Sequence, residues 1–228
     1  MRKSIWLILT LVVVFFSCSK DNDYVAPDIG HDYAGLEAGK YVVYDVDSFF
    51  YDDFNSTIDT SYFQIKEVVD SEYEDLEGEE AFKIIRYRKE IDSTSWVLID
   101  VWYSKLTQTN FQKTEENNKF VKLIFPVRNN STWNGNSMNN LDEMEYAYTS
   151  IDHSETVGGV SLNNVLTVLQ YEFSPLTEEN LFEEKYAKGI GLVYKKSIEI
   201  YNVYNTSTGL WERNSGFDIT MTLSSYGG

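Results

Sequence analysis

Cysteine, histidine and proline are almost absent from this chain of 228 residues, which has one, two and three of them respectively. A single cysteine excludes an internal disulfide, and so few thiols and imidazoles exclude a zinc site of the usual type. The sequence also lacks a Gly-x-Ser-x-Gly nucleophile elbow. Because the common catalytic constellations are missing, we expect neither an enzyme nor a cofactor.

The only long apolar run lies at the N-terminus, where Ile5 to Phe16 follow two basic residues. A run of about a dozen residues is too short to cross a bilayer, but it suits a secretory signal. The sole cysteine, Cys18, comes directly after the small residue Ser17. This predicts a lipoprotein signal peptide over residues 1–17, cleaved to leave Cys18 lipidated. The alternative is an ordinary signal peptide with an incidental cysteine, although a free thiol is a liability in an oxidising compartment.

The residues after Cys18 indicate where the anchor is held. Ser19 is not the Asp that tends to retain lipoproteins at the inner membrane, and Lys20-Asp21-Asn22-Asp23 follows. This tetrapeptide resembles the Lys-plus-acidic tag of surface lipoproteins from Bacteroidetes-type bacteria. The resemblance implies an outer-membrane anchor that faces outward at the cell surface. Two or more acyl chains make such anchoring stable.

Basic residues are also scarce. Cleavage removes Arg2 and Lys3, so 17 basic and 36 acidic residues remain, a formal charge of −19. This charge repels nucleic acid and anionic lipid headgroups. We therefore expect no nucleic-acid partner, and contact with the membrane only through the lipid anchor.

Few linkers divide the rest of the chain. Residues 18–35 are polar and contain Pro27 and Gly30, which predicts a flexible tether after the lipidated cysteine. No Gly/Ser-rich spacer follows, so we expect a single β-rich domain over residues 36–228. A faint internal similarity, with Gly78 and Gly158-Gly159 each preceding a strand, suggests two β-meander halves, although chance is an equal explanation.

The hydrophobic pattern of this domain is that of strands. Segments rich in aromatic and β-branched residues are bounded by Asp, Ser, Gly or Asn, and in several of them polar and apolar residues alternate. The pattern predicts a mainly β fold, either a curved antiparallel sheet or a half-open β-barrel. The predicted strands cover residues 41–46, 62–69, 81–88, 96–103, 119–125, 145–151, 165–173, 192–203 and 217–223.

One short α-helix is predicted at about residues 176–187. Ser174 or Thr177 can cap it, acidic residues crowd its first turns, and Gly189 follows its end. A buried stripe of Leu181, Phe182 and Tyr186 would close the open side of the sheet.

A second resemblance concerns residues 184–194, Glu-Lys-Tyr-Ala-Lys-Gly-Ile-Gly-Leu-Val-Tyr. This segment resembles the Tyr-Ala-x-Gly-Val-Gly-Leu-Val turn of a group of bacterial lipoproteins with strongly curved antiparallel sheets. Phe125-Pro126-Val127 and Trp133 correspond to the group's Pro-Leu…Gly…Trp stretch, without its glycine. The resemblance implies a curved sheet and brings no known activity. Gly189 and Gly191 also suit a left-handed turn and a close backbone approach, without any ligand.

Histidines and carboxylates are the remaining candidates for chemistry. His31 falls in the predicted tether, and His153 in a turn between strands. Acidic residues cluster at 45–53 and 72–80, yet neither cluster has the alternating spacing of a calcium loop. A glycosidase needs two carboxylates about 5–10 Å apart in a cleft, which a sequence cannot test. We interpret both clusters as solvated loops and leave loose calcium binding open.

Aromatic residues are abundant, with 17 Tyr and 5 Trp. Exposed rings can stack on sugars, and Trp96, Trp102, Trp133 and Trp211 are candidates. Aromatic pairs across strands also stabilise sheets whatever their function, which is the plainer explanation.

Three functional hypotheses follow. The first, which we favour, is a non-enzymatic, lipid-anchored surface protein that binds a ligand or a protein partner. The second is a half-barrel that handles lipids or lipoproteins, which requires an apolar concave face covered by the predicted helix. The third is a carbohydrate-binding or carbohydrate-active protein. The sequence gives neither the ligand nor the oligomeric state.

Overall fold

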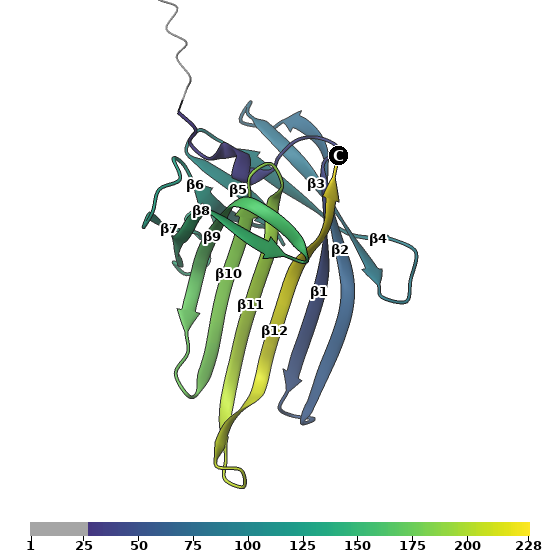
Figure 1. The fold of residues 1–228 in the computed structure, drawn as a ribbon, viewed down its shortest axis with the longest axis vertical. Coiled ribbons are helices and arrows are strands. Elements are labelled where there is room, and N and C mark those ends of the chain that lie inside the picture. The colour runs from purple at the N-terminus through teal and green to yellow at the C-terminus, as the bar shows by residue number, and fades with distance from the viewer. Residues whose placement is uncertain (1–26) are drawn as a thin grey trace, which may run out of the picture.

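The structure is a computed structural model that describes residues 27–228, most of which form one antiparallel sheet of 12 strands (Figure 1). The predicted fold class, a mainly β curved sheet, is confirmed. The predicted signal peptide and Cys18 lie outside the described residues. The strands are β1 (Tyr41–Asp52), β2 (Thr57–Glu74), β3 (Glu80–Glu90), β4 (Val97–Leu106), β5 (Asn110–Glu115), β6 (Asn118–Ile124), β7 (Thr132–Asn134), β8 (Glu145–Val157), β9 (Val160–Phe173), β10 (Glu178–Ala187), β11 (Gly191–Asn205) and β12 (Leu210–Gly227).

The strand order places the two ends of the chain together in the middle of the sheet. From one edge to the other it is β6-β5-β4-β3-β2-β1-β12-β11-β10-β9-β8-β7. The first strand and the last pair antiparallel from Tyr41↔Gly227 to Tyr51↔Gly216. Each of the nine predicted strands is present. The sheet is therefore two six-stranded meanders joined at β1 and β12.

The two outermost strands are brought together by curvature. The Val121 N–H of β6 donates to the Gly135 carbonyl just after β7 (2.9 Å). The Trp133 indole N–H donates to the Val121 carbonyl (2.8 Å). The Tyr148 hydroxyl accepts from the Ile124 N–H (2.8 Å) and donates to the Ile124 carbonyl (2.7 Å). Side chains thus satisfy backbone groups that an open edge would leave for another chain.

The main apolar core lies inside the curve. A single-turn 3₁₀ helix, η1 (His31–Ala34), places Tyr33 and Ala34 in it. Residues 29–35 were predicted as part of a flexible tether, but here they pack on the core. They contribute Tyr33, which donates a hydrogen bond to Asp152 (2.7 Å). The other buried members of this core are Phe111, Leu123, Phe125, Tyr146, Tyr148, Leu166, Val168 and Tyr186.

A smaller core lies on the opposite face of the sheet, where hairpin β8–β9 folds over β12. Val157 and Leu162 of the hairpin pack with Val193 and Leu223. Gly158 has a φ of +56°, and a Cβ at this position would lie 1.7 Å from the Leu223 carbonyl oxygen. Only glycine permits this close approach.

The predicted α-helix at residues 176–187 is wrong, because residues 178–187 form strand β10, paired with both β9 and β11. Along this strand Phe182, Glu184 and Tyr186 share one face, and Glu184 is fully buried. The acidic residues that suggested the first turns of a helix are therefore split between the two faces of a strand. Tertiary pairing overrides local propensity here.

The left-handed conformation predicted for Gly189 is present, with a φ of +76°, but it turns the hairpin β10–β11 instead of ending a helix. Gly191 has a φ of +94°, and a Cβ there would lie 3.2 Å from the Ala34 carbonyl oxygen, so η1 packs closely on this turn. Over residues 27–228, no helix has the length and apolarity needed to span a bilayer.

Candidate functional site

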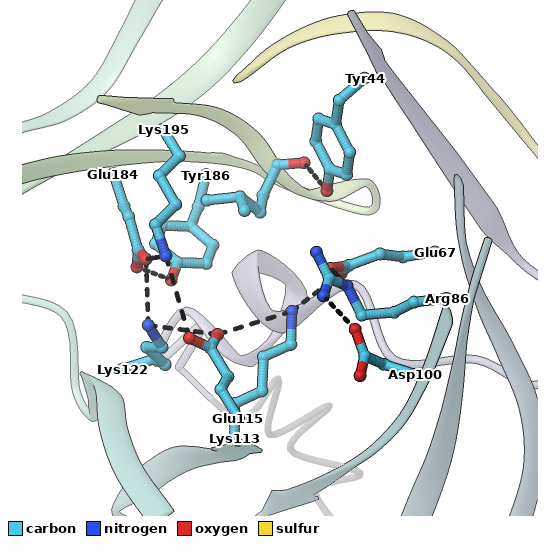
Figure 2. A network of polar contacts seen from close by, with 11 residues as sticks. Tyr44, Glu67, Arg86, Asp100, Lys113, Glu115, Lys122, Glu184, Tyr186 and Lys195 are labelled. Atoms are coloured by element: carbon cyan, nitrogen blue, oxygen red, sulfur yellow. Dashed lines mark hydrogen bonds and ion pairs between the residues drawn. The ribbon is translucent and has the colours of Figure 1, made fainter. Parts of the chain in front are cut away.

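The interior of the curved sheet holds a network of charged side chains (Figure 2). Four acidic and four basic groups take part, so the network is neutral. Its members come from seven strands on both walls of the sheet. The acidic groups are Glu67, Asp100, Glu115 and Glu184, and the basic groups are Arg86, Lys113, Lys122 and Lys195.

The network has two linked parts. In one, Arg86 Nε lies 3.0 Å from Glu67, and Lys113 Nζ lies 2.8 Å from the same carboxylate. In the other, Lys122 Nζ lies 3.0 Å from Glu184. The pairing of β5 with β6 explains why Lys122 points into the interior. Lys122 is the extra residue of a β-bulge in β6. Such bulges redirect a side chain, here into the interior.

The second part ties opposite walls of the sheet together. Lys122 on β6 reaches Glu184 on β10, and Lys195 on β11 lies 3.3 Å from Glu184 and 3.8 Å from Glu115 on β5. Tyr186 donates a hydrogen bond of 2.5 Å to the other oxygen of Glu184. Removing one ion of such a cluster leaves its partners buried and unpaired, which is costly.

The buried carboxylates of this network are held in their ionised form by the lysines around them. Burial alone would raise the pKa of Glu184, but Lys122 and Lys195 outweigh it and lower the pKa to about 2. The pKa of Glu115 is likewise lowered, because Lys122, Lys195 and Lys113 outweigh its burial. Burial and the nearby Glu184 raise the pKa of Tyr186. With both carboxylates ionised, neither offers the proton that a glycosidase acid must donate.

The free space beside this network is small. A cavity of about 60 Å³, lined in part by Tyr44, Glu67, Glu115 and Glu184, lies well below the usual volume of a small-molecule site. Over residues 27–228 the interior therefore has no cavity of the size that the lipid-handling hypothesis requires, and the segment expected to form the covering helix is a strand. In the part of the chain described here, the interior network serves to hold the walls together.

Exposed apolar side chains gather at the end of the molecule that lies away from the N-terminal segment. Figure 1 shows the N-terminal segment at the top and the turns of hairpins β1–β2, β9–β10 and β11–β12 at the bottom. We call residues 47–62, 171–182 and 199–217 the distal end. Twelve of the 23 exposed large hydrophobic side chains in residues 27–228 belong to it: Phe50, Phe54, Ile58, Tyr62, Tyr171, Phe173, Leu176, Tyr201, Val203, Tyr204, Leu210 and Trp211.

The next hairpin, β3–β4, extends this surface, because β3 pairs with β2. Near its turn it adds four more exposed apolar side chains, Ile91, Val97, Leu98 and Ile99. Some of the distal residues also meet across strands. Phe50 pairs with Phe217 in the β1–β12 register, and the Tyr204 and Trp211 rings lie 5.6 Å apart between centroids. A concentration of exposed apolar side chains is typical of interaction sites on soluble proteins.

The distal end is strongly acidic as well. Its residues include nine Asp or Glu but a single basic residue, Arg213. Arg213 is already engaged by Glu179 (2.7 Å) and Asp218 (2.9 Å). The surface therefore offers apolar contacts within a negative field.

Neither histidine contacts the acidic clusters at residues 45–53 and 72–80. His31 lies in η1, with its ring edge-on to Phe125 at 4.5 Å between centroids. His153, predicted in a turn, lies within β8, where Ser150 and Glu155 contact its two ring nitrogens at 2.9 and 3.0 Å. Lys185 also binds Glu155, at 2.6 Å, and neutralises it. The predicted lipidation site, Cys18, stays a prediction.

The two acidic clusters have separate structural roles. Asp52 accepts hydrogen bonds from the Phe54 and Asn55 backbone in the β1–β2 turn. In the second cluster, Asp75, Glu77 and Glu79 surround Lys105. No group of three or more His, Cys, Asp or Glu within residues 27–228 is arranged to hold a metal ion.

The tryptophans named from the sequence are scattered. Trp102 is in the interior, with the Arg86 guanidinium 3.5 Å from its ring centroid. Trp133 helps to close the sheet, and Trp96 lies beneath Lys89, at 5.0 Å. Trp211 alone belongs to the distal end. No local pattern indicates the interior network, because charged residues that alternate along a strand ordinarily mark a solvent-exposed face.

No protein-family model matches the chain, and no curated protein matches it in sequence. Among solved structures, one similar protein is from Bacteroides fragilis, inferred to be exported and described as having a YmcC-like fold. It has a TM-score of 0.42 and 9% identity over 85% of this chain and 97% of its own. A second, inferred to be a lipoprotein, is from Parabacteroides distasonis, with a TM-score of 0.42 and 9% identity over 86% of this chain and 98% of its own. At this level of similarity neither structure bears on function.

Proposed function

We propose that this chain is a non-enzymatic lipoprotein, anchored through Cys18 at the outer face of the outer membrane, whose distal end binds a protein partner. The observation that carries the proposal is the concentration of exposed apolar side chains at the distal end. Within residues 27–228 the interior offers no competing site of ligand size, since the cavity beside its ionic network has a volume of about 60 Å³.

The position of the distal end suits a surface role. The described chain begins at Pro27, at the end of the molecule away from these hairpins (Figure 1). Only eight residues separate Cys18 from Pro27, a reach of roughly 30 Å when fully extended. An anchor on that side leaves the hairpin turns directed away from the membrane, toward other molecules at the surface.

Charge specifies the kind of partner. Nine acidic residues and one paired arginine favour a polypeptide that carries basic side chains together with apolar ones. A second copy of the chain is disfavoured, because a symmetric contact would place the same acidic surface against itself. A bilayer surface is disfavoured by the same charge, since anionic lipids would be repelled.

The test uses two synthetic twelve-residue peptides and residues 19–228. One peptide alternates Lys and Val, and the other alternates Glu and Val. We expect fluorescence anisotropy to give micromolar binding of the basic peptide and none of the acidic one. The double variant L210S/W211S, which keeps every charge, should weaken binding at least tenfold, which is about 1.4 kcal/mol.

The matched control is Y226S, at an exposed tyrosine near the opposite end of β12. It should bind the basic peptide as the parent does. Equal binding by the parent and by L210S/W211S would reduce the effect to net charge and overturn the proposal. Sedimentation equilibrium showing a dimer that this variant abolishes, or vesicle binding that it abolishes, would assign the surface to a second copy or to lipid instead.

A further inference from the structure

A groove on the other end of the molecule is separate from the distal end. It has a volume of about 420 Å³, within the usual range for small-molecule sites and far larger than the interior cavity. Hairpin β2–β3 forms one wall, and β4, β5 and β6 form the floor. Two half-exposed tyrosines, Tyr73 and Tyr103, line it with their rings edge-to-face at 6.0 Å between centroids.

The hairpin wall is fixed in place. Asp75 accepts hydrogen bonds from the backbone N–H of Glu77 (2.9 Å) and of Glu79 (3.0 Å), which shapes the turn. Lys105 on β4 lies within 2.8 Å of carboxylate oxygens of Asp75, Glu77 and Glu79, which holds the turn against the strand. The groove is therefore formed before any ligand arrives, which lowers the entropic cost of binding.

The lining combines aromatic faces with hydrogen-bonding groups. Tyr73 and Tyr103 each carry a hydroxyl, Thr114 adds another, and Gln112 keeps a carbonyl acceptor while its N–H donates to Asn110 (2.7 Å). Donors and acceptors of this type match the hydroxyl groups of a neutral polar ligand. The negative face of a tyrosine ring attracts the weakly positive C–H groups on one side of a sugar ring.

The charges of the lining argue against anionic ligands and metal cations. The ammonium of Lys105 is already shared by three carboxylates, so it is not free for a phosphate or carboxylate ligand. Glu74 and Lys119 are the other charged groups of the lining, which leaves a slight excess of negative charge. The carboxylates are in turn occupied by Lys105, so they do not form a cation site.

We infer that this groove binds a neutral carbohydrate, with Tyr103 as the stacking platform. This site goes beyond the proposed docking of a protein partner and does not depend on it, because the two surfaces share no residue. The ligand is bound without chemical change.

The experiment screens residues 19–228 on a printed array of neutral glycans and follows with isothermal titration calorimetry of the glycans bound. We expect at least one neutral oligosaccharide to bind. Tyr103→Ala should weaken its affinity at least tenfold, while Tyr103→Phe, which keeps the ring, should stay within about threefold. Y226S is the control and should bind as the parent does.

Three results would overturn the inference. They are the absence of binding to every neutral glycan, binding that Tyr103→Ala leaves unchanged, and binding restricted to anionic glycans. Circular dichroism of Tyr103→Ala must match the parent, and Tyr103→Phe reports on the groove if the alanine variant does not fold. L210S/W211S should keep glycan binding while losing the peptide, so either proposal can fail alone.

Discussion

The interior and the distal end of this protein each depart from the usual distribution of polarity, one by holding charged groups beside an apolar core and the other by exposing apolar groups. Eight charged groups form a network inside the curved sheet, while sixteen large apolar side chains are exposed near the turns of four adjacent hairpins. The charged groups are tolerated inside because every one has a partner of opposite sign within 4.0 Å. The apolar groups outside have no partner in the described chain. Charged groups can thus be buried because they pair within the molecule, whereas the exposed apolar groups indicate contact with another molecule.

The largest effect should come from removing one interior lysine. Lys122→Ala leaves Glu115 and Glu184 buried with fewer cations. We expect the free energy of unfolding to fall by about 3–5 kcal/mol, as measured by urea denaturation. Lys83→Ala is the matched control, because Lys83 forms a surface pair with Asp70 and should matter little. An equal loss in both variants would remove the distinction between the interior and the surface.

A pH titration should sharpen the same comparison. The pKa of Glu184 is about 2 in the folded state and near 4.5 in an unfolded chain, so the unfolded state binds more protons below about pH 4.5. The stabilisation from Glu184 is present above about pH 4.5 and is lost as the pH falls toward 2. We expect the melting temperature of the parent to fall steeply in this range.

The variant that checks this prediction is Glu184→Gln, which cannot titrate and should show a shallower fall in the same range. Glu72→Gln, at an exposed position of β2, should follow the parent curve. If Glu184→Gln retained the full slope, acid unfolding would have to be assigned to other carboxylates.

The smallest effect on stability is expected at the distal end. Leu210→Ser should change the free energy of unfolding by less than about 0.5 kcal/mol, because the side chain is already exposed. Its retention on a hydrophobic interaction column should nevertheless decrease measurably. A loss of several kcal/mol would mean that Leu210 supports the fold and is not part of a free surface.

The sheet itself could be predicted from the sequence because its strands carry local signals. Alternation along residues 82–87 predicts that Phe82 and Ile84 share one face of a strand, and both are buried. Strand β5 was missed, because Lys113 and Glu115 have the appearance of solvent-facing residues. The wrong prediction of a helix at residues 176–187 has the same cause, because its charged residues also have the appearance of solvent-facing ones. Glu184 is buried only because Lys122 and Lys195, distant in sequence, lie beside it, and no local pattern records that pairing.

The candidate sites could be predicted even less well. Trp102 was a candidate for an exposed stacking surface, yet it lies in the interior beneath Arg86. The tyrosines of the groove, Tyr73 and Tyr103, come from different strands, and only the register of β2, β3 and β4 brings them together. The distal end depends on hairpin turns meeting at one end of the sheet. These are properties of topology, not of local sequence.

The pairing of β1 with β12 has a consequence for how the protein folds. The two strands are separated by most of the chain, so the centre of the sheet forms only when the last strand is available. A chain that ended before Leu210 would leave the edges of both β1 and β11 unpaired and open to other chains. Folding of the sheet is therefore completed only after β12, the last strand, has been made.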